Sequence, residues 1–413
     1  MKWALRLSMI LLCAMPFAHS IESARGEEEP RVAVAKVVLA DYWAKETRNA
    51  RVLHVAYFCP ADRTPAPQYQ ERLTRILEDI SSFYTAQFQH YNLACDGIPF
   101  ERSADGRLVI HLVQGTQPAA DYSEAKSAGE IKRDVEKVMS AAGVAVKSNH
   151  VVVFTRLGNY DGTKTSHNSP YCGAGDCRNG FCWQFDSDIL DTHLLPKTTP
   201  FVDDKQYGHI NLGRYNSIFI GGTAHELGHL FGLPHNATTP ENLKGVGHSL
   251  MGDGNRHYHE ELQGAGKGSF IPLADALMLC TNPLFSRVDK GLSEKWQSSI
   301  VDPAFDTSVA GRFKITGHYT SNQPIYGVVA YVNPNVKDDH GAVSYLGTLG
   351  ADNSFSIDVA APPAPKGIGD VRIILLSASG QHLSAYAGTR APFRQPYAMG
   401  VDKRITVGEP GQK

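Results

Sequence analysis

The stretch GGTAHELGHLFGLPH, residues 221–235, constrains the fold more than any other part of the chain. On an α-helix, His225 and His229 are four residues apart and turned about 40° from each other, so both imidazoles project from one face. Two histidines at this spacing can bind one metal ion. The stretch therefore predicts a helix with a metal-binding face.

A third histidine, His235, follows His229 by six residues, and on a continuous helix it would project about 120° away. The chain must therefore turn after His229. Gly232 stands where the turn is needed, because glycine takes positive φ without penalty, and Pro234 stops the helix from resuming. A catalytic zinc takes three protein ligands and keeps a fourth position open. We therefore predict a zinc site formed by His225, His229 and His235.

Glu226 is adjacent to His225 but does not have the spacing of a ligand. A carboxylate beside the open position of a zinc site can accept a proton from an activated water molecule. Three glycines lower the helix propensity by about 1 kcal/mol each relative to alanine, so we expect close packing or an approaching substrate at Gly221, Gly222 and Gly228. The alternative is an apolar core helix with incidental histidines, and it leaves the fixed spacing of five residue types unexplained.

The pattern H-E-x-x-H-x-x-G-x-x-H resembles that of the metzincin metalloendopeptidases. Met251, in the sequence HSLMGDG, is similar to the Met-turn of that family. The resemblance covers about residues 51–284 and implies an α/β (α+β) catalytic domain with a mostly parallel, twisted sheet. It implies these roles: zinc ligation by His225, His229 and His235, general-base catalysis by Glu226, a chain turn at Gly232, and a hydrophobic base beneath the metal at Met251.

Two positions differ from familiar metzincin branches. Asn236 follows the third histidine, so the resemblance assigns no subfamily. Asp253 stands where astacin- and serralysin-like members have a tyrosine that reaches the metal. Tyr258 lies further along and is more typical of a wall or surface residue.

The resemblance implies a secreted zinc endopeptidase that acts on a peptide or protein substrate. Two alternatives remain open at this point. One is a zinc amidase that acts on a non-protein, cell-wall amide. The other is a catalytically silent binding or adhesion protein that uses its C-terminal region, although a metal-only scaffold would not need Glu226.

The rest of the chain divides into two regions by its hydrophobic pattern. Strand-like runs alternate with amphipathic helices up to residue 157, which is typical of a mainly parallel sheet. Residues 158–215 are expected to form a long polar loop. Beyond Cys280, short alternating runs predict an all-β sandwich. We expect an N-terminal segment at 21–50, a catalytic domain at 51–300 and an accessory β-sandwich domain at 301–413.

The first twenty residues are typical of an export signal. Lys2 and Arg6 precede an apolar run at 7–18, and residues 18–20 form a small-x-small cleavage pattern. The run is shorter than the ~20 residues that span a bilayer, and an N-terminal anchor or a buried helix is the alternative. We expect a signal peptide at 1–20, a secreted or otherwise extracytoplasmic protein, and no integral membrane segment.

Removal of such a signal would leave six of the seven cysteines. An even number in an exported chain favours three disulfides. A structural zinc cluster is the alternative for Cys172, Cys177 and Cys182, although they lack two-residue spacings and a fourth ligand. A structural calcium site is a further expectation, at Asp203, Asp204 and residues 159–162. The net charge of −2 shows no basic excess that would favour nucleic acid as a partner.

Overall fold

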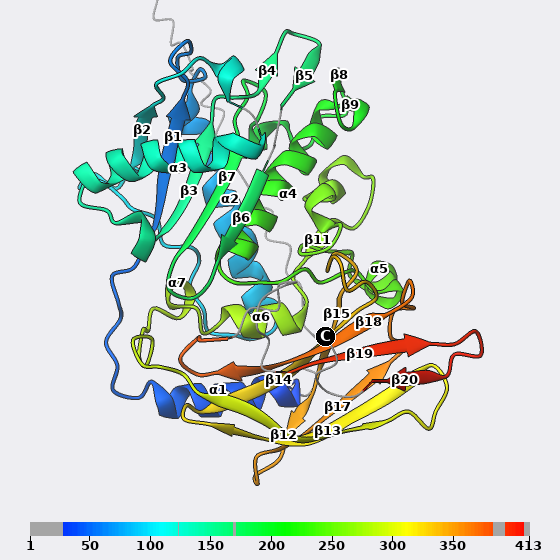
Figure 1. The fold of residues 1–413 in the computed structure, drawn as a ribbon. Coiled ribbons are helices and arrows are strands. Elements are labelled where there is room, and N and C mark those ends of the chain that lie inside the picture. Colours follow the sequence, from blue (N-terminus) through cyan, green and yellow to red (C-terminus); the bar gives the residue numbers. More distant parts are fainter. Residues whose placement is uncertain (1–27, 123, 168–170, 383–392, 409–413) are drawn as a thin grey trace, which may run out of the picture.

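The computed structural model describes residues 28–122, 124–167, 171–382 and 393–408. The expected signal peptide at 1–20 lies outside the described residues. An α/β part packs on top of a β-sandwich (Figure 1). Among the described helices, none is long and apolar enough to cross a membrane.

The α/β part is built on a five-stranded sheet in the order β2-β1-β3-β7-β6. The first four strands are parallel, and β6 is antiparallel to β7 at the edge. Strands β1 and β3 are buried along their whole length, which explains their continuous apolar sequences. The mainly parallel sheet confirms the mixed α/β class expected from the sequence. Its strands are β1 (Leu53–Cys59), β2 (Ile110–Gln114), β3 (His150–Thr155), β6 (Tyr171–Gly175) and β7 (Gly180–Phe185).

Helices cover both faces of this sheet (Figure 1). The helices α2 (Tyr69–His90) and α4 (Leu212–Leu230) share one hydrophobic core with one sheet face. Apolar residues of α2 recur every three or four positions, as the sequence predicted, and they form its buried side. On the opposite face, α3 (Glu124–Ala141) packs over a second, smaller core.

The expected loop at 158–215 is wrong, because much of it forms strands. In it, β6 and β7 extend the main sheet, and four short strands form a second sheet in the order β4-β5-β8-β9. Each strand is six residues long or shorter, so no run is long enough to show a clear alternation. The four strands are β4 (Asn159–Tyr160), β5 (Lys164–Ser166), β8 (Phe201–Asp204) and β9 (Gly208–Asn211).

Two antiparallel sheets follow, in the orders β12-β13-β17-β16 and β15-β14-β18-β19-β20. Their facing apolar residues form a separate core, as in a β-sandwich. The strands are β12 (Ser298–Asp306), β13 (Arg312–Ser321), β14 (Ile325–Asn333), β15 (Val343–Leu346), β16 (Thr348–Leu349), β17 (Ser354–Ala360), β18 (Gly369–Ser377), β19 (Phe393–Met399) and β20 (Ile405–Val407).

The sandwich is joined to the α/β part by a continuous hydrophobic core. Strands β14 and β18 are buried on both faces, and Tyr326, Tyr331 and Ile374 belong to the core that contains α2 and α4. The hydroxyl of Tyr331 donates to Asp275 Oδ1 (3.0 Å), which lies on α6 (Leu273–Leu279). The helix α1 (Pro30–Tyr42) contributes to the same core and lies beneath β14 (Figure 1).

The remaining described elements are short and connect these parts. They are α5 (Pro240–Gly245), β10 (His248–Ser249), β11 (Ser269–Phe270) and α7 (Pro283–Ser286). Strands β10 and β11 pair in parallel and hold the segment that precedes Met251.

The six cysteines of the described residues are free thiols, so the expectation of three disulfides is not met in this structure. Cys172 lies opposite Trp183 on the β6–β7 hairpin, whereas Cys182 lies opposite Gly173. Residues in these two pairs point to opposite faces of the hairpin. The two thiols therefore cannot bond to each other or share one metal ion, which also removes the alternative of a zinc cluster there.

Candidate metal centre

Helix α4 carries His225, Glu226 and His229, and all three are buried. The side chain of Asn211 caps the helix by accepting from the backbone N–H of Arg214 (2.7 Å). Three of the four glycines of α4 are positions where other groups approach its C-terminal half closely. A Cβ there would lie 2.2 Å from Asn255 O at Gly221, 2.5 Å from the Tyr171 ring at Gly222 and 2.4 Å from Met251 Sδ at Gly228.

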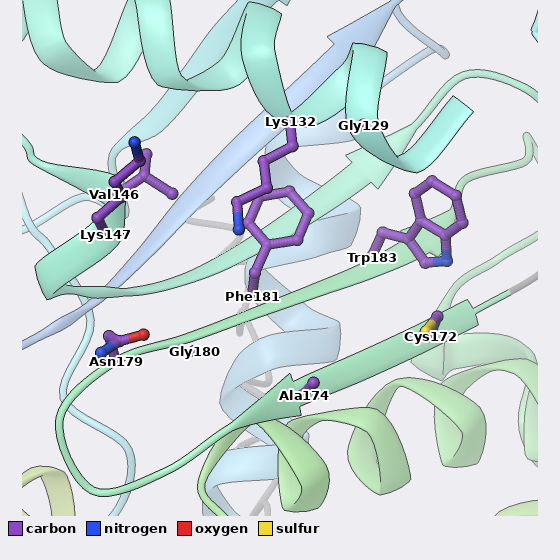
Figure 2. Close-up of a pocket in the computed structure, with 10 residues that line it drawn as sticks. All are labelled: Gly129, Lys132, Val146, Lys147, Cys172, Ala174, Asn179, Gly180, Phe181 and Trp183. Atoms are coloured by element: carbon purple, nitrogen blue, oxygen red, sulfur yellow. The ribbon is translucent and has the colours of Figure 1, made fainter. Parts of the chain in front are cut away.

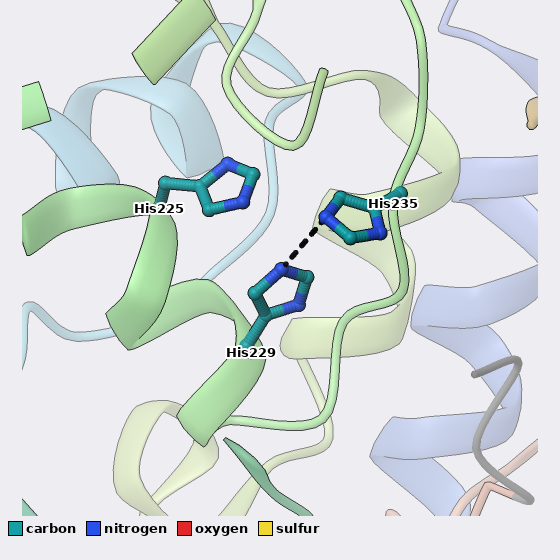
Figure 3. Close-up of side chains that lie close together, drawn as sticks. All are labelled: His225, His229 and His235. Atoms are coloured by element: carbon teal, nitrogen blue, oxygen red, sulfur yellow. Dashed lines mark hydrogen bonds between the residues drawn. The ribbon is translucent and has the colours of Figure 1, made fainter. Parts of the chain in front are cut away.

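The chain reverses immediately after α4. Gly232 has φ +102°, which glycine adopts without strain. The backbone N–H of Leu233 donates to Gly228 O (2.9 Å), and that of Gly232 donates to His229 O (3.0 Å). This turn brings His235 back beside the two helical histidines, so that the three rings face one another (Figure 3).

Each of the three histidines has its Nδ1 atom against a protein oxygen. His225 Nδ1 lies 2.7 Å from Leu250 O, and His229 Nδ1 lies 2.8 Å from Leu233 O. His235 Nδ1 lies 2.7 Å from Asp339 Oδ1. Because carbonyl and carboxylate oxygens accept hydrogen bonds, each Nδ1 carries a hydrogen, and when the ring is neutral the lone pair lies on Nε2 and can bind a metal ion.

The spacing of the Nε2 atoms fits zinc. His229 Nε2 and His235 Nε2 are 3.3 Å apart (dashed line in Figure 3). Two nitrogens bound tetrahedrally to zinc, each at about 2.0–2.1 Å, would be about 3.3–3.4 Å apart. The ligand atoms of the three histidines all lie within 4.8 Å of one another. The donor set and its spacing are therefore ones that could hold a metal ion.

Burial favours the neutral form of His225 and His229. It lowers the pKa of His225 to about 4, with a smaller opposing effect from the hydrogen bond to Leu250 O. It also lowers the pKa of His229 well below its ordinary value, and the neighbouring His225 and His235 lower it further. Neutral imidazole is the form that binds a metal ion, so these ligands need no deprotonation at neutral pH.

Glu226 lies on the side of α4 that faces the edge strand β6. Its side chain is 7% exposed. Burial raises the pKa of its carboxyl to about 8, and a hydrogen bond with the backbone of Gly173 opposes this shift. A carboxyl group with such a pKa can exchange a proton near neutral pH.

The segment around Met251 packs against α4 beside the three histidines. Met251 is fully buried, and its Sδ faces the position where a Cβ of Gly228 would lie. Its carbonyl oxygen accepts from the backbone N–H of Asn236 (3.0 Å), and the preceding carbonyl, of Leu250, orients His225. One turn thus holds both the first ligand and the residue after the third ligand.

Two nearby residues singled out in the sequence point elsewhere. Asp253 accepts from Thr238 Oγ1 (2.7 Å) and pairs with His248 (3.0 Å). Tyr258 is buried, and its hydroxyl donates to Asp79 Oδ2 (2.7 Å). Both side chains therefore have structural partners away from the three histidines.

The residues expected to bind calcium have structural partners within the protein. Asp203 bonds to His209 (2.7 Å). Asp204 accepts from Thr165 Oγ1 (2.7 Å) and from the backbone of residues 206–207. Asp161 caps its own turn. Among the described residues, the clusters with metal-ligand geometry lie elsewhere, so calcium gains no support here.

Another cluster, His54, Glu101 and His111, has the geometry of a hydrogen-bond network. Glu101 Oε2 lies 2.5 Å from His54 Nδ1 and 2.8 Å from His111 Nε2. These distances are those of hydrogen bonds to one shared oxygen and are shorter than the spacing of zinc ligands. The two imidazoles serve as hydrogen-bond partners of the half-buried Glu101 carboxylate.

Two contributors to the site were not singled out in the sequence. Asp339 bonds to His235, and the ring of His340 stacks on His235 with centroids 4.2 Å apart. Their only signal is the polar sequence KDDHG between two strand-like runs, which is also typical of an ordinary turn. Gly173 is the third residue missed, because β6 was assigned to a loop.

No protein-family model matches the chain, and no curated protein sequence does. Its fold is similar to that of OgpA from Akkermansia muciniphila. Catalytically inactive OgpA, in complex with an O-glycopeptide (glycodrosocin) substrate, has a TM-score of 0.67 and 22% identity, over 85% of this chain and 94% of that chain. Wild-type OgpA has a TM-score of 0.68 and 22% identity, over 88% and 96%. The likeness includes both the α/β part and the sandwich, and it shows a shared fold.

Proposed function

We propose that the protein is a zinc-dependent endopeptidase of the metzincin kind, in which His225, His229 and His235 hold the metal and Glu226 is the general base. The observation that supports the proposal is that the three rings, each with Nδ1 held by a protein oxygen, bring their ligand atoms within 4.8 Å of one another. When bound there, zinc would polarise a scissile carbonyl and lower the pKa of water.

Glu226 moves the proton in this proposal. Its carboxylate accepts a proton from the attacking water while the water oxygen bonds to the carbonyl carbon. The same carboxyl then delivers that proton to the amide nitrogen as the carbon–nitrogen bond breaks, which yields a carboxylic acid and an amine. Burial around Glu226 supports this role, because a raised pKa allows the group to act as base and then as acid.

Strand β6 is suited to align a peptide substrate. It is the edge strand of the main sheet and lies directly against α4 at Gly173. An extended peptide can add to such an edge through main-chain hydrogen bonds. A peptide aligned along β6 would pass beside Glu226.

The substrate class that we favour is an O-glycosylated peptide. OgpA, with a similar fold, was solved with an O-glycopeptide substrate. Here a hollow of ≈ 430 Å³ lies on the α3 side of the β6–β7 hairpin, lined by Phe181, Trp183 and Lys132 (Figure 2). Trp183 is 7% exposed, and its Nε1 has no hydrogen-bond partner among the described residues. An aromatic surface that carries a hydrogen-bond donor is suited to binding a sugar ring.

The decisive experiment compares Glu226→Gln with wild type on a peptide library, with the zinc content measured for both. We expect the variant to fold and bind zinc but to lose at least 10²-fold in turnover, because it cannot accept the proton. Glu241→Gln, on the exposed α5, is the matched control and should keep wild-type activity. If Glu226→Gln kept more than a tenth of the activity, the proposed role of Glu226 would be wrong.

The substrate class is tested with matched glycosylated and unmodified peptides. We expect faster cleavage of the glycopeptide, and Trp183→Phe should raise its KM while leaving the unmodified peptide unaffected. Trp296→Phe, in the sandwich core, is the control. Equal rates on both peptides would limit the proposal to a general endopeptidase. Failure to cleave any peptide would instead favour a cell-wall amidase or a binding protein.

A further inference from the structure

The loop at 334–342, which joins β14 to β15, reaches from the β-sandwich into the metal centre. Asp339 Oδ1 accepts from His235 Nδ1 at 2.7 Å, across a sequence separation of 104 residues. The ring of His340 stacks on one face of the same imidazole at an interplanar angle of 28°. Two consecutive residues of the sandwich thus fix the orientation of the third histidine.

The sandwich holds this loop rigidly. Asn333, fully buried at the end of β14, donates to Asp338 O (3.0 Å) and to Asp370 Oδ1 (3.0 Å). The backbone N–H of Ala342 donates to Asp339 O (3.0 Å) and closes the turn. The position of Asp339 is therefore set by β14 and β18.

The same loop pairs with the chain that follows the third histidine. The backbone N–H of Ala237 donates to Ala342 O (2.6 Å). The side chain of Asn236 accepts from the backbone of Ser344 (3.1 Å) and donates to its hydroxyl (2.9 Å). Residues on both sides of the His235–Asp339 contact are thus connected, so the two side chains are held in register.

A buried cation lies behind the carboxylate. Arg372 of β18 is 2% exposed, and its Nη1 lies 3.6 Å from Asp339 Oδ2. Its Nε lies 3.3 Å from Asp370 Oδ2. One oxygen of Asp339 therefore faces the guanidinium while the other faces His235.

His235 is the one ligand of the three that is oriented by a charged group. His225 and His229 donate to backbone carbonyls of the α/β part. A carboxylate that accepts from a ligand histidine fixes its ring and raises its basicity, and its loss typically weakens metal binding about 10–100-fold. Such an effect requires the sandwich to be docked, because Asp339 is supplied by the sandwich loop.

We propose that Asp339 is a positioning residue for the third metal ligand, so that the β-sandwich forms part of the metal centre and is more than an accessory module. This inference rests on the proposed function, since it assumes that His225, His229 and His235 bind zinc. Its consequence is that zinc affinity depends on the docking of the sandwich through Asp339.

The test measures the zinc Kd of the full chain by competition with a chromogenic chelator, for wild type, Asp339→Ala and Asp339→Asn. We expect the Kd to rise about 10–100-fold in Asp339→Ala. It should rise less in Asp339→Asn, whose amide oxygen can still accept from His235. Asp352→Asn, at an exposed position of the turn between β16 and β17, is the matched control and should bind zinc as wild type does.

Thermal unfolding of the zinc-free proteins separates positioning from a purely structural role. Asp339→Asn has nearly the same volume and keeps the fold measurable if Asp339→Ala does not fold. The inference would be overturned if the zinc Kd were unchanged in Asp339→Asn, and in Asp339→Ala where that variant folds, whatever the Tm of the zinc-free proteins. Asp339 would then have only a structural role, in support of Arg372. If wild type itself bound no zinc, the proposed function would fail instead, so the two failures are distinguishable.

Discussion

The backbone of Gly173 on the edge strand β6 lies against the backbone of Glu226 on α4. A Cβ at position 173 would lie 2.3 Å from the carbonyl oxygen of Glu226, which is closer than any real Cβ contact. Helix and edge strand can approach this closely only because residue 173 has no side chain. Gly175 of the same strand makes a similar approach, with a Cβ that would lie 2.1 Å from Leu230 O of α4, so the distance between strand and helix depends on both glycines.

Gly173→Ala should separate β6 from α4. The clash is with backbone, so it cannot be relieved by a side-chain rotation, and overpacking of this kind typically costs about 1–3 kcal/mol. We expect a lower free energy of unfolding in urea and at least a tenfold loss of kcat/KM on peptides. Gly129→Ala is the control, because a Cβ on that α3 residue would meet nothing within 4 Å. Wild-type stability and activity in Gly173→Ala would contradict the close approach of strand and helix.

Zinc should stabilise the folded chain and should do so through the three histidines. A metal ion that binds only the folded state raises its stability by mass action, by about 4 kcal/mol at a thousandfold excess over Kd. We expect the Tm of wild type to fall when a chelator removes zinc and to recover when zinc is restored. His235→Ala should show almost no zinc-dependent change in Tm, whereas His54→Ala, in the separate His–Glu–His network, should keep it. If zinc raised the Tm of His235→Ala as much as that of wild type, the metal ion would bind at another site.

Asp275 should make the stability of the zinc-free protein fall as the pH rises. Burial raises the pKa of this carboxyl to about 7, against weaker opposing hydrogen bonds from Asn236 and Tyr331. In the unfolded chain the group titrates near its ordinary value of about 3.9. Between these two values the folded state holds a proton that the unfolded state has released, so the free energy of unfolding decreases as the pH rises through this window and levels off above it.

The measurement for Asp275 is urea unfolding in chelator at about pH 4.5 and about pH 8, for wild type and Asp275→Asn. The amide cannot ionise, so wild type should lose stability relative to the variant, on the order of 2 kcal/mol or more, since one pKa unit is about 1.4 kcal/mol. Glu241→Gln, an exposed change, should follow wild type at both pH values. A stability difference between wild type and Asp275→Asn that did not change with pH would show that this carboxyl ionises normally in the folded protein.

The sequence predicted the structure best for elements in which residues of one kind recur at a regular spacing. The three- and four-residue repeat of α2 and the continuous apolar runs of β1 and β3 predicted the elements that form the main sheet and its backing helix. The same holds for α4, where the histidine spacing predicted both the shared helix face and the turn at Gly232.

The sequence was least informative where long-range pairing decides the structure. The β6–β7 hairpin is short and rich in glycine, and it forms a strand pair because its glycines permit contact with α4, which is distant in sequence. Asp339 is in a polar turn whose sequence does not reveal that it lies beside His235. The number of cysteines also could not reveal that Cys172 and Cys182 lie on opposite faces of the β6–β7 hairpin, because it carries no information on strand pairing.

The central claim is tested most directly by zinc-dependent peptide cleavage. The full-length protein is stripped with a chelator, zinc is returned in increments, and the initial rate of cleavage of a peptide library is measured at each step. The account predicts no cleavage by the stripped protein and a rate that rises in proportion to added zinc until it saturates at one zinc per chain. Cleavage at the wild-type rate by protein verified to be zinc-free, or no cleavage at any zinc concentration, would contradict the account.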